Sequence, residues 1–195
     1  FGMKSWCWDD NDNLYWWGNS GIFRLNNQGT IENITKFSLP EIIKDIAPDP
    51  TLHIITMGFD SRKHGIVICI TKVSDGTNNN FWLDLRSFGI FPETYPTSIG
   101  VSCQHFYNAD DDDYRHLLLG CKDGYVRYFN ESSKNDDTGA TDTAISSYVV
   151  LGPYPFNSVP GVEGKLLNSF VTLGGGASGG AMSDTDGLQL SYYTG

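Results

Sequence analysis

Positive charge is scarce in this 195-residue chain: 13 Lys and Arg residues stand against 23 Asp and Glu residues, which gives a formal net charge of −10. Such a surface repels phosphate backbones and anionic membranes, which argues against sequence-specific nucleic-acid binding. Long apolar runs are missing as well. No window approaches the roughly 18 apolar residues that a transmembrane helix needs, so the sequence predicts no membrane segment.

The cysteines lack the spacing of a metal site, because no two of them form a CxxC pair. There are four: Cys7, Cys69, Cys103 and Cys121. Cys69 lies in the strand-like run 66–71 and Cys121 in an apolar hairpin arm, so we predict buried free thiols rather than disulfides. The sequence predicts neither a metal site nor a cofactor.

Segment 116–130 has the pattern of a complete β-hairpin, and a similar pattern occurs 103 residues earlier, at 14–26. A glycine in third place of each turn suits a type I turn closed by a left-handed residue. We therefore predict a repeating antiparallel unit, in which the two arginines pair with loop carboxylates. Laid on each other without gaps, the hairpins match Leu117 with Leu14, Gly124 with Gly21 and Arg127 with Arg24.

Runs rich in β-branched and aromatic residues, separated by Gly, Asn and Asp, predict an all-β fold. Units of about 50 residues favour a β-propeller segment of three to four blades, and an irregular β-sandwich is the alternative. The blades are expected at approximately 5–50, 51–100, 101–151 and, incompletely, 165–195. Strands are expected at 5–8, 14–26 (a hairpin), 30–36, 52–59, 66–73, 81–85, 101–107, 116–130 (a hairpin), 145–151 and 166–173.

The sequence contains one candidate helix, Pro40–Ala47, which would make at most two turns. The chain begins with Phe1 and ends on an alternating strand-like stretch, 188–195, with no partner after it. An unpaired terminal strand would leave an open sheet edge. We therefore expect the propeller segment 1–195 to be a fragment of a longer polypeptide.

A serine-protease motif is the strongest catalytic candidate, because Gly176-Ala-Ser178-Gly-Gly180 has the G-x-S-G-G pattern of trypsin-like enzymes. His53 or His64, and an aspartate at 84 or within 110–113, would complete the order His, Asp, Ser. Neither histidine follows a small-residue strand end, however, and only 17 residues follow Ser178, too few to finish a second barrel. A glycine-rich hairpin tip explains the same letters. We predict no catalytic residue and a protein that is not an enzyme, with the trypsin-like protease as an alternative.

Two acidic loops, 9–13 and 110–113, offer the oxygen ligands that Ca²⁺ prefers, but neither has the glycine and distal glutamate of an EF-hand loop. We predict solvated turns that keep strand edges apart by charge. No Asp or Glu is singled out by a motif as one of the carboxylates of glycoside hydrolysis.

The tryptophans allow either sugar binding or packing. They are Trp6, Trp8, Trp16, Trp17 and Trp82. Strand alternation places Trp6 and Trp8 on one face, and Trp16 and Trp17 on opposite faces. We predict that these rings pack between blades. A carbohydrate-binding or glycosidase-like propeller is the alternative.

Segment 117–130, the Asp- and Thr-rich loop after it and segment 145–153 together resemble β-propeller virion proteins of tailed bacteriophages. Segments 80–86 and 91–96 are similar to the preceding blade of such proteins, and the resemblance covers roughly residues 52–195. It implies a structural role in the tail, most familiarly that of nozzle proteins, which extend the tube below the portal and adaptor rings of short-tailed phages. That family has no catalytic residues to carry over.

The resemblance also implies the location and the partners. The protein is expected in the virion tail, as a cyclic homo-oligomer that contacts portal, adaptor and other tail proteins. DNA would only pass it non-specifically during ejection. An acidic surface suits such a conduit, because each exposed cation on the path of DNA adds a salt-dependent contact.

Overall fold

The computed structural model describes residues 4–36, 46–130, 135–137 and 142–144. These residues form antiparallel β-sheets with a short 3₁₀ helix, η1 (Asp112–Tyr114), so the predicted all-β fold class is confirmed. The predicted helix at 40–47 lies outside the described residues apart from its last two. The expected strands at 145–151 and 166–173, and the fourth predicted unit at 165–195, also lie outside them.

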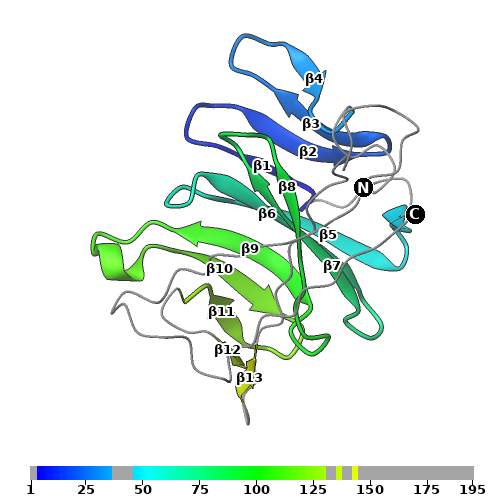
Figure 1. The fold of residues 1–195 in the computed structure, drawn as a ribbon, viewed down its shortest axis with the longest axis vertical. Helices are drawn as coiled ribbons and strands as arrows, with labels where there is room; N and C mark the ends of the chain where they lie inside the picture. The colour runs from blue at the N-terminus through cyan, green and yellow to red at the C-terminus, as the bar shows by residue number, and fades with distance from the viewer. Residues whose placement is uncertain (1–3, 37–45, 131–134, 138–141, 145–195) are drawn as a thin grey trace, which may run out of the picture. The chain divides into compact units, whose positions relative to one another are not determined.

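Three open sheets follow one another along the chain, and in each of them every strand pairs antiparallel with the next (Figure 1). The first sheet contains β1 (Trp6–Trp8), β2 (Leu14–Gly18), β3 (Gly21–Leu25) and β4 (Ile31–Asn33). The second contains β5 (His53–Asp60), β6 (Gly65–Lys72), β7 (Asn78–Asp84) and β8 (Ile90–Glu93). The third contains β9 (Val101–Tyr107), β10 (His116–Cys121) and β11 (Val126–Tyr128). A separate hairpin joins β12 (Asn135–Asp137) and β13 (Asp142–Ala144).

Three strands, β8 and the two of the β12–β13 hairpin, were not expected from the sequence. Strand β8 contains Pro92 and lies in a stretch predicted only as an exit from the second unit. It is an edge strand, where a proline's missing N–H costs no ladder hydrogen bond. The hairpin β12–β13 forms in the Asp- and Thr-rich stretch that follows segment 117–130, where no strand was expected. The three sheets otherwise fall within the first three predicted units.

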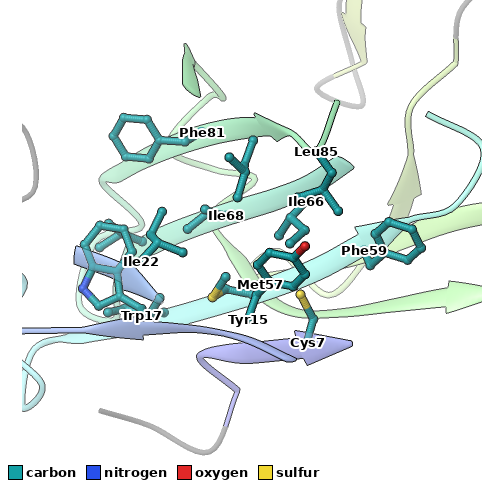
Figure 2. Packing of buried hydrophobic residues seen from close by; sticks show 13 residues of the cluster. Cys7, Tyr15, Trp17, Ile22, Met57, Phe59, Ile66, Ile68, Phe81 and Leu85 are labelled. Atoms are coloured by element: carbon teal, nitrogen blue, oxygen red, sulfur yellow. The ribbon is translucent and has the colours of Figure 1, made fainter. Parts of the chain in front are cut away.

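The second sheet lies between the other two, and β6 shows this residue by residue. Ile66, Ile68 and Ile70 pack in the cluster that contains Tyr15 and Trp17 of the first sheet (Figure 2). The intervening residues of β6 pack in a different cluster, with the third sheet. A strand covered on one face alternates between buried and exposed residues, whereas a strand covered on both faces stays apolar throughout.

Hydrogen bonds hold the first strands of the three sheets together. Met57 N donates to Lys4 O, just before β1, at 3.1 Å. On the other side of β5, Gln104 Nε2 donates to Thr56 Oγ1 at 2.7 Å. Lys4 Nζ donates to Ser102 O at 3.0 Å and so links the segment before β1 to β9. The sheets therefore meet along their first strands.

The two similar hairpins occupy the same place in their sheets, as second and third strands, and the second sheet separates them. Their turns differ. Gly18 pairs with Gly21 across a two-residue turn, whereas residues 122–124 form a three-residue turn closed by Tyr125, with Gly124 at φ 89°. The predicted turn is therefore correct only for the later hairpin.

The extra turn residue corrects the gap-free alignment of the first arms. Arg24 pairs with Tyr15 across its hairpin, and Arg127 with Leu119. The structural counterpart of Leu119 is therefore Tyr15, whereas the gap-free alignment matches Leu119 with Trp16. A shift of one residue exchanges the two faces of a strand, and Tyr15 and Leu119 are indeed both buried.

Candidate interaction surface

One face of the first sheet is apolar and open to solvent. Residues paired across strands share a face, so the register puts Trp6, Trp16 and Phe23 in one row and Trp8, Leu14, Leu25 and Ile31 in the next. We call these seven residues the aromatic face. Trp6, Trp8 and Ile31 are 49%, 51% and 62% exposed. The rings of Trp16 and Phe23 stack at 5.5 Å, beside a shallow hollow of about 760 Å³ with Ser5, Asn19 and Ser20 at its rim.

The opposite face of the same sheet is buried against the second sheet. Cys7, Tyr15, Trp17 and Ile22 form this covered face, which Figure 2 shows opposite Met57 and Ile68. The prediction that the tryptophans pack between sheets is confirmed for Trp17 and for Trp82, which lies against the cluster between the second and third sheets. It is wrong for Trp6, Trp8 and Trp16 within the described part of the chain, because they share the face of this sheet that no described sheet covers.

The third sheet also presents side chains on the face turned away from the second sheet. This third-sheet face consists of Cys103, His105, Tyr107, Leu118 and Val126, as the register of β9, β10 and β11 requires, with His116 and Tyr128 at the end that also borders the second sheet. Tyr107, Val126 and Tyr128 are 50%, 67% and 49% exposed. The His116 and Tyr128 rings stack at 4.4 Å. The described sheets thus end in two faces with exposed apolar and aromatic side chains.

A polar cleft of about 370 Å³ lies between the second and third sheets and is lined by Asp60, Arg62, Lys63, His116 and Phe129, among others. Arg62 Nη1 donates to Arg115 O at 3.1 Å and approaches His116 Nδ1 at 3.3 Å, while His116 Nε2 lies 2.8 Å from Asp113 O. Since arginine has no acceptor, His116 accepts at Nδ1 and carries its proton on Nε2. The polar groups of this cleft largely bind one another.

Glu93 lies beside this cleft, where it accepts a hydrogen bond from Tyr95 Oη at 2.5 Å. Burial raises the pKa of Glu93, and the Tyr95 hydrogen bond and the charge of Lys63 only partly oppose this. A raised carboxyl pKa contributes stability at low pH that is lost as the pH rises through the folded-state value.

The wild type is expected to lose stability as the pH rises and Glu93 ionises, and Glu93→Gln should not show this loss. The amide keeps the acceptor for Tyr95 but carries no charge. Urea unfolding midpoints from pH 4 to pH 8 would measure this. The unfolding midpoint of the variant should rise relative to that of the wild type as the pH increases. A constant difference at all pH values would contradict the raised pKa.

The acidic loop after β1 is organised around Asp9, which is only 8% exposed. Its carboxylate accepts hydrogen bonds from Asn11 N at 2.8 Å, Asn13 N at 2.9 Å, Asn13 Nδ2 at 2.7 Å and Tyr15 Oη at 3.2 Å. In the second loop, Asp112 pairs with Arg115, and Asp111 caps η1. The described residues contain no group of three or more His, Cys, Asp or Glu side chains that could hold a metal ion.

Asp9→Ala is expected to lower the free energy of unfolding by about 2 kcal/mol, because it leaves two backbone N–H groups of a tight turn without their acceptor. Asp10→Ala, in the same loop but exposed, is the matched control and should change stability by less than about 0.5 kcal/mol. Chemical denaturation measures both. A gain in wild-type stability on adding Ca²⁺, absent from Asp9→Ala, would contradict a purely structural turn.

Of the protease candidates, His64 and Asp84 lie in neighbouring positions, because Leu85 N donates to His64 O and Gly65 pairs with Asp84, but His53 lies apart from them. His53 begins β5, whereas His64 lies in the turn beyond the other end of that strand, against Phe59. Asp84 accepts hydrogen bonds from Arg86 and Ser87. Ser178 and its glycines lie outside the described residues.

The predicted arginine pairs are formed, although with different kinds of partner. Arg127 Nη2 lies 2.7 Å from Asp123 Oδ2, in the turn of its own hairpin, as expected. Arg24 Nη2 lies 2.7 Å from Glu32 Oε1, which belongs to the neighbouring strand β4 rather than to a loop. Both pairs are structural.

All four cysteines are free thiols, as predicted, and Cys7, Cys69 and Cys121 are buried. Burial raises the pKa of the Cys69 thiol, which keeps it protonated. Cys103 corrects the prediction of burial, because it lies exposed on the third-sheet face. Within the part of the chain that the structure describes, no helix has the length and apolar character needed to cross a membrane.

No protein-family model, curated protein or solved structure matches this chain. The interpretation of the surfaces therefore depends on the described geometry and on the sequence.

Proposed function

We propose that the chain is a structural component of a tailed-bacteriophage virion, built from consecutive β-propeller blades. One observation carries the propeller part of this proposal. The three sheets succeed one another along the chain, stack face to face and meet along their first strands.

The spacing of the sheets favours blades over an irregular sandwich. β1, β5 and β9 begin at residues 6, 53 and 101, so successive sheets begin 47 and 48 residues apart. A β-propeller repeats four-stranded antiparallel sheets around an axis at such a period. A two-layer sandwich, by contrast, would leave one face of the second sheet uncovered.

A structural role agrees with the chemistry of the described surfaces. The polar cleft is largely satisfied by its own groups, and the Asp9 carboxylate organises a turn rather than an open site. The tail location, the portal, adaptor and other tail partners, the cyclic homo-oligomer and the passage of ejected DNA all follow from the resemblance to virion propellers. The net charge of −10 supports weak, non-specific contact with DNA.

Mass spectrometry of purified particles tests the virion part of the proposal. The polypeptide should be present in a fixed ratio to the major tail proteins, and electron microscopy of the protein should show rings or ring-forming contacts with tail partners. Absence from intact particles would overturn the virion assignment. A fold determined by experiment with unstacked sheets would overturn the propeller.

A glycan-binding module is the second candidate, because half-exposed Trp6 and Trp8 flank a hollow with exposed Asn19 and Ser20 at its rim. Exposed indole rings stack on the apolar faces of sugars, and the rim supplies hydrogen bonds. Retention on a glycan array that is lost in Trp8→Ala, but kept in Tyr114→Ala, would favour this function.

A further inference from the structure

We propose that the aromatic face of one copy of this chain stacks on the third-sheet face of a second copy, head to tail. The inference rests on the sheet stacking of the proposed function but not on the virion location. It names the surface and the partner of an assembly contact.

The aromatic face exposes a contiguous apolar surface that a partner could cover. An indole side chain has on the order of 250 Å² of surface, so Trp6 and Trp8 at half exposure leave on the order of 250 Å² uncovered between them. Ile31, 62% exposed on the same face, adds to this contiguous area. The total approaches the largest apolar patch of a typical soluble monomer, and that patch is often a functional surface.

The stacking inside the chain indicates what covers this face. The first sheet already places one apolar face on the second sheet, and the second sheet places its other face on the third. Both contacts join sheet faces with alternating apolar side chains. A second copy offers a face that the described residues leave partly open, where Leu118 lies between His105 and Tyr128 and Val126 lies in the next row.

Head-to-tail contact also continues the direction in which the three described sheets follow one another. Two copies bring six of these sheets together, which lies within the range of four to eight that propeller-like rings contain. Contact between two unlike faces is a heterologous interface, which forms a closed ring if the rotation closes and a filament if it does not.

Complementation between variants tests this contact. Trp6→Arg with Trp8→Arg charges the aromatic face, and Tyr107→Arg with Val126→Arg charges the third-sheet face. Tyr114→Arg is the matched control, because this ring is 65% exposed but lies in η1, off both faces. Light scattering coupled to size exclusion gives the masses, and circular dichroism shows that each variant is folded.

Wild type and Tyr114→Arg should run at about 43 kDa, twice the 21.6 kDa of the chain, or larger. Each double variant alone should be monomeric. Their equimolar mixture should recover a particle of two chains, because one intact aromatic face then meets one intact third-sheet face. A monomeric wild type, or a mixture that stays monomeric, would overturn the proposal, as would dimers of the third-sheet variant alone, which indicate contact between two aromatic faces.

The wild-type chain gives a second readout that survives if a variant misfolds. Cys103 lies on the third-sheet face and is the exposed one of the four cysteines, so a maleimide should label it selectively. Its labelling rate is expected to fall at least about tenfold at protein concentrations that favour assembly, because the contact covers the thiol. A rate independent of concentration would overturn the proposal.

Failure of this contact is distinguishable from failure of the proposed function. Recovery of the two-chain particle together with absence from virions leaves the contact and removes the virion assignment. Presence in virions together with a monomeric wild type keeps the virion assignment and removes the contact between copies. The aromatic face would then bind another part of the polypeptide or another tail protein.

Discussion

Replacing Ile68 by alanine is expected to lower the free energy of unfolding by about 3 to 4 kcal/mol, and replacing its neighbour Val67 by about 2 kcal/mol. Ile68 is 0% exposed and packs with the first sheet, whereas Val67 is 1% exposed and packs with the third. Each substitution leaves a cavity in a different interface. Urea unfolding at constant pH measures both losses.

Strand β10 supplies the control, because there the two faces differ. Leu119 is 4% exposed in the cluster with the second sheet, and its neighbour Leu118 points to the partly open third-sheet face. Leu119→Ala should cost about 3 kcal/mol and Leu118→Ala about 1 kcal/mol. A loss below about 0.5 kcal/mol for Val67→Ala would contradict the three-layer stack and favour the two-layer sandwich.

Much of the strand order could be predicted, because short apolar runs between turn residues carry a strong local signal. The stretch from Ile66 to Thr71 is almost wholly apolar, and both its strand state and its burial follow from that. The Lys122-Asp123-Gly124 turn was predicted correctly because a left-handed position favours glycine. These features depend on nearest neighbours in the sequence.

The features that the sequence did not predict depend on the exact number of residues in a turn or on whether a strand has a neighbour on both sides. One residue fewer in the earlier turn moves Tyr15 onto the face that the gap-free alignment gave to Trp16. Pro92 argued against a strand, yet β8 tolerates it because an edge strand has a neighbour on one side only.

The sequence shows the apolar alternation that forms the candidate surface, but it does not show that this face is exposed. Trp6 and Trp8 alternate with Cys7, and Leu14 and Trp16 alternate with Tyr15 and Trp17, so both faces of the first sheet are apolar. That pattern predicts two covered faces. Which of them another sheet covers within the chain depends on which distant residues share a core cluster, as Tyr15 and Ile68 do, and periodicity does not contain this information.

Gly58→Val is expected to cost about 3 kcal/mol, because β5 and the third sheet approach each other more closely at Gly58 than a side chain allows. A Cβ atom on Gly58 would lie 2.5 Å from Gln104 Oε1 and 2.9 Å from both Gln104 Cβ and Leu117 Cδ1. Two of these three atoms belong to Gln104, whose Nε2 also donates to Thr56 Oγ1. The added side chain therefore forces apart the strands that join the two sheets.

A double-mutant cycle with Gln104→Ala shows whether the cost arises at this contact. Gln104→Ala alone should cost about 1 kcal/mol through the lost hydrogen bonds to Thr56. In the double variant the closest of the three contacts, with Gln104 Oε1, is gone, whereas those with Cβ of residue 104 and with Leu117 stay. The combined loss should therefore be about 1 kcal/mol smaller than the sum of the single losses. Additive losses would contradict the close approach of Gln104 Oε1 to Gly58, and a loss below about 0.5 kcal/mol for Gly58→Val alone would contradict the stacking of β5 on the third sheet.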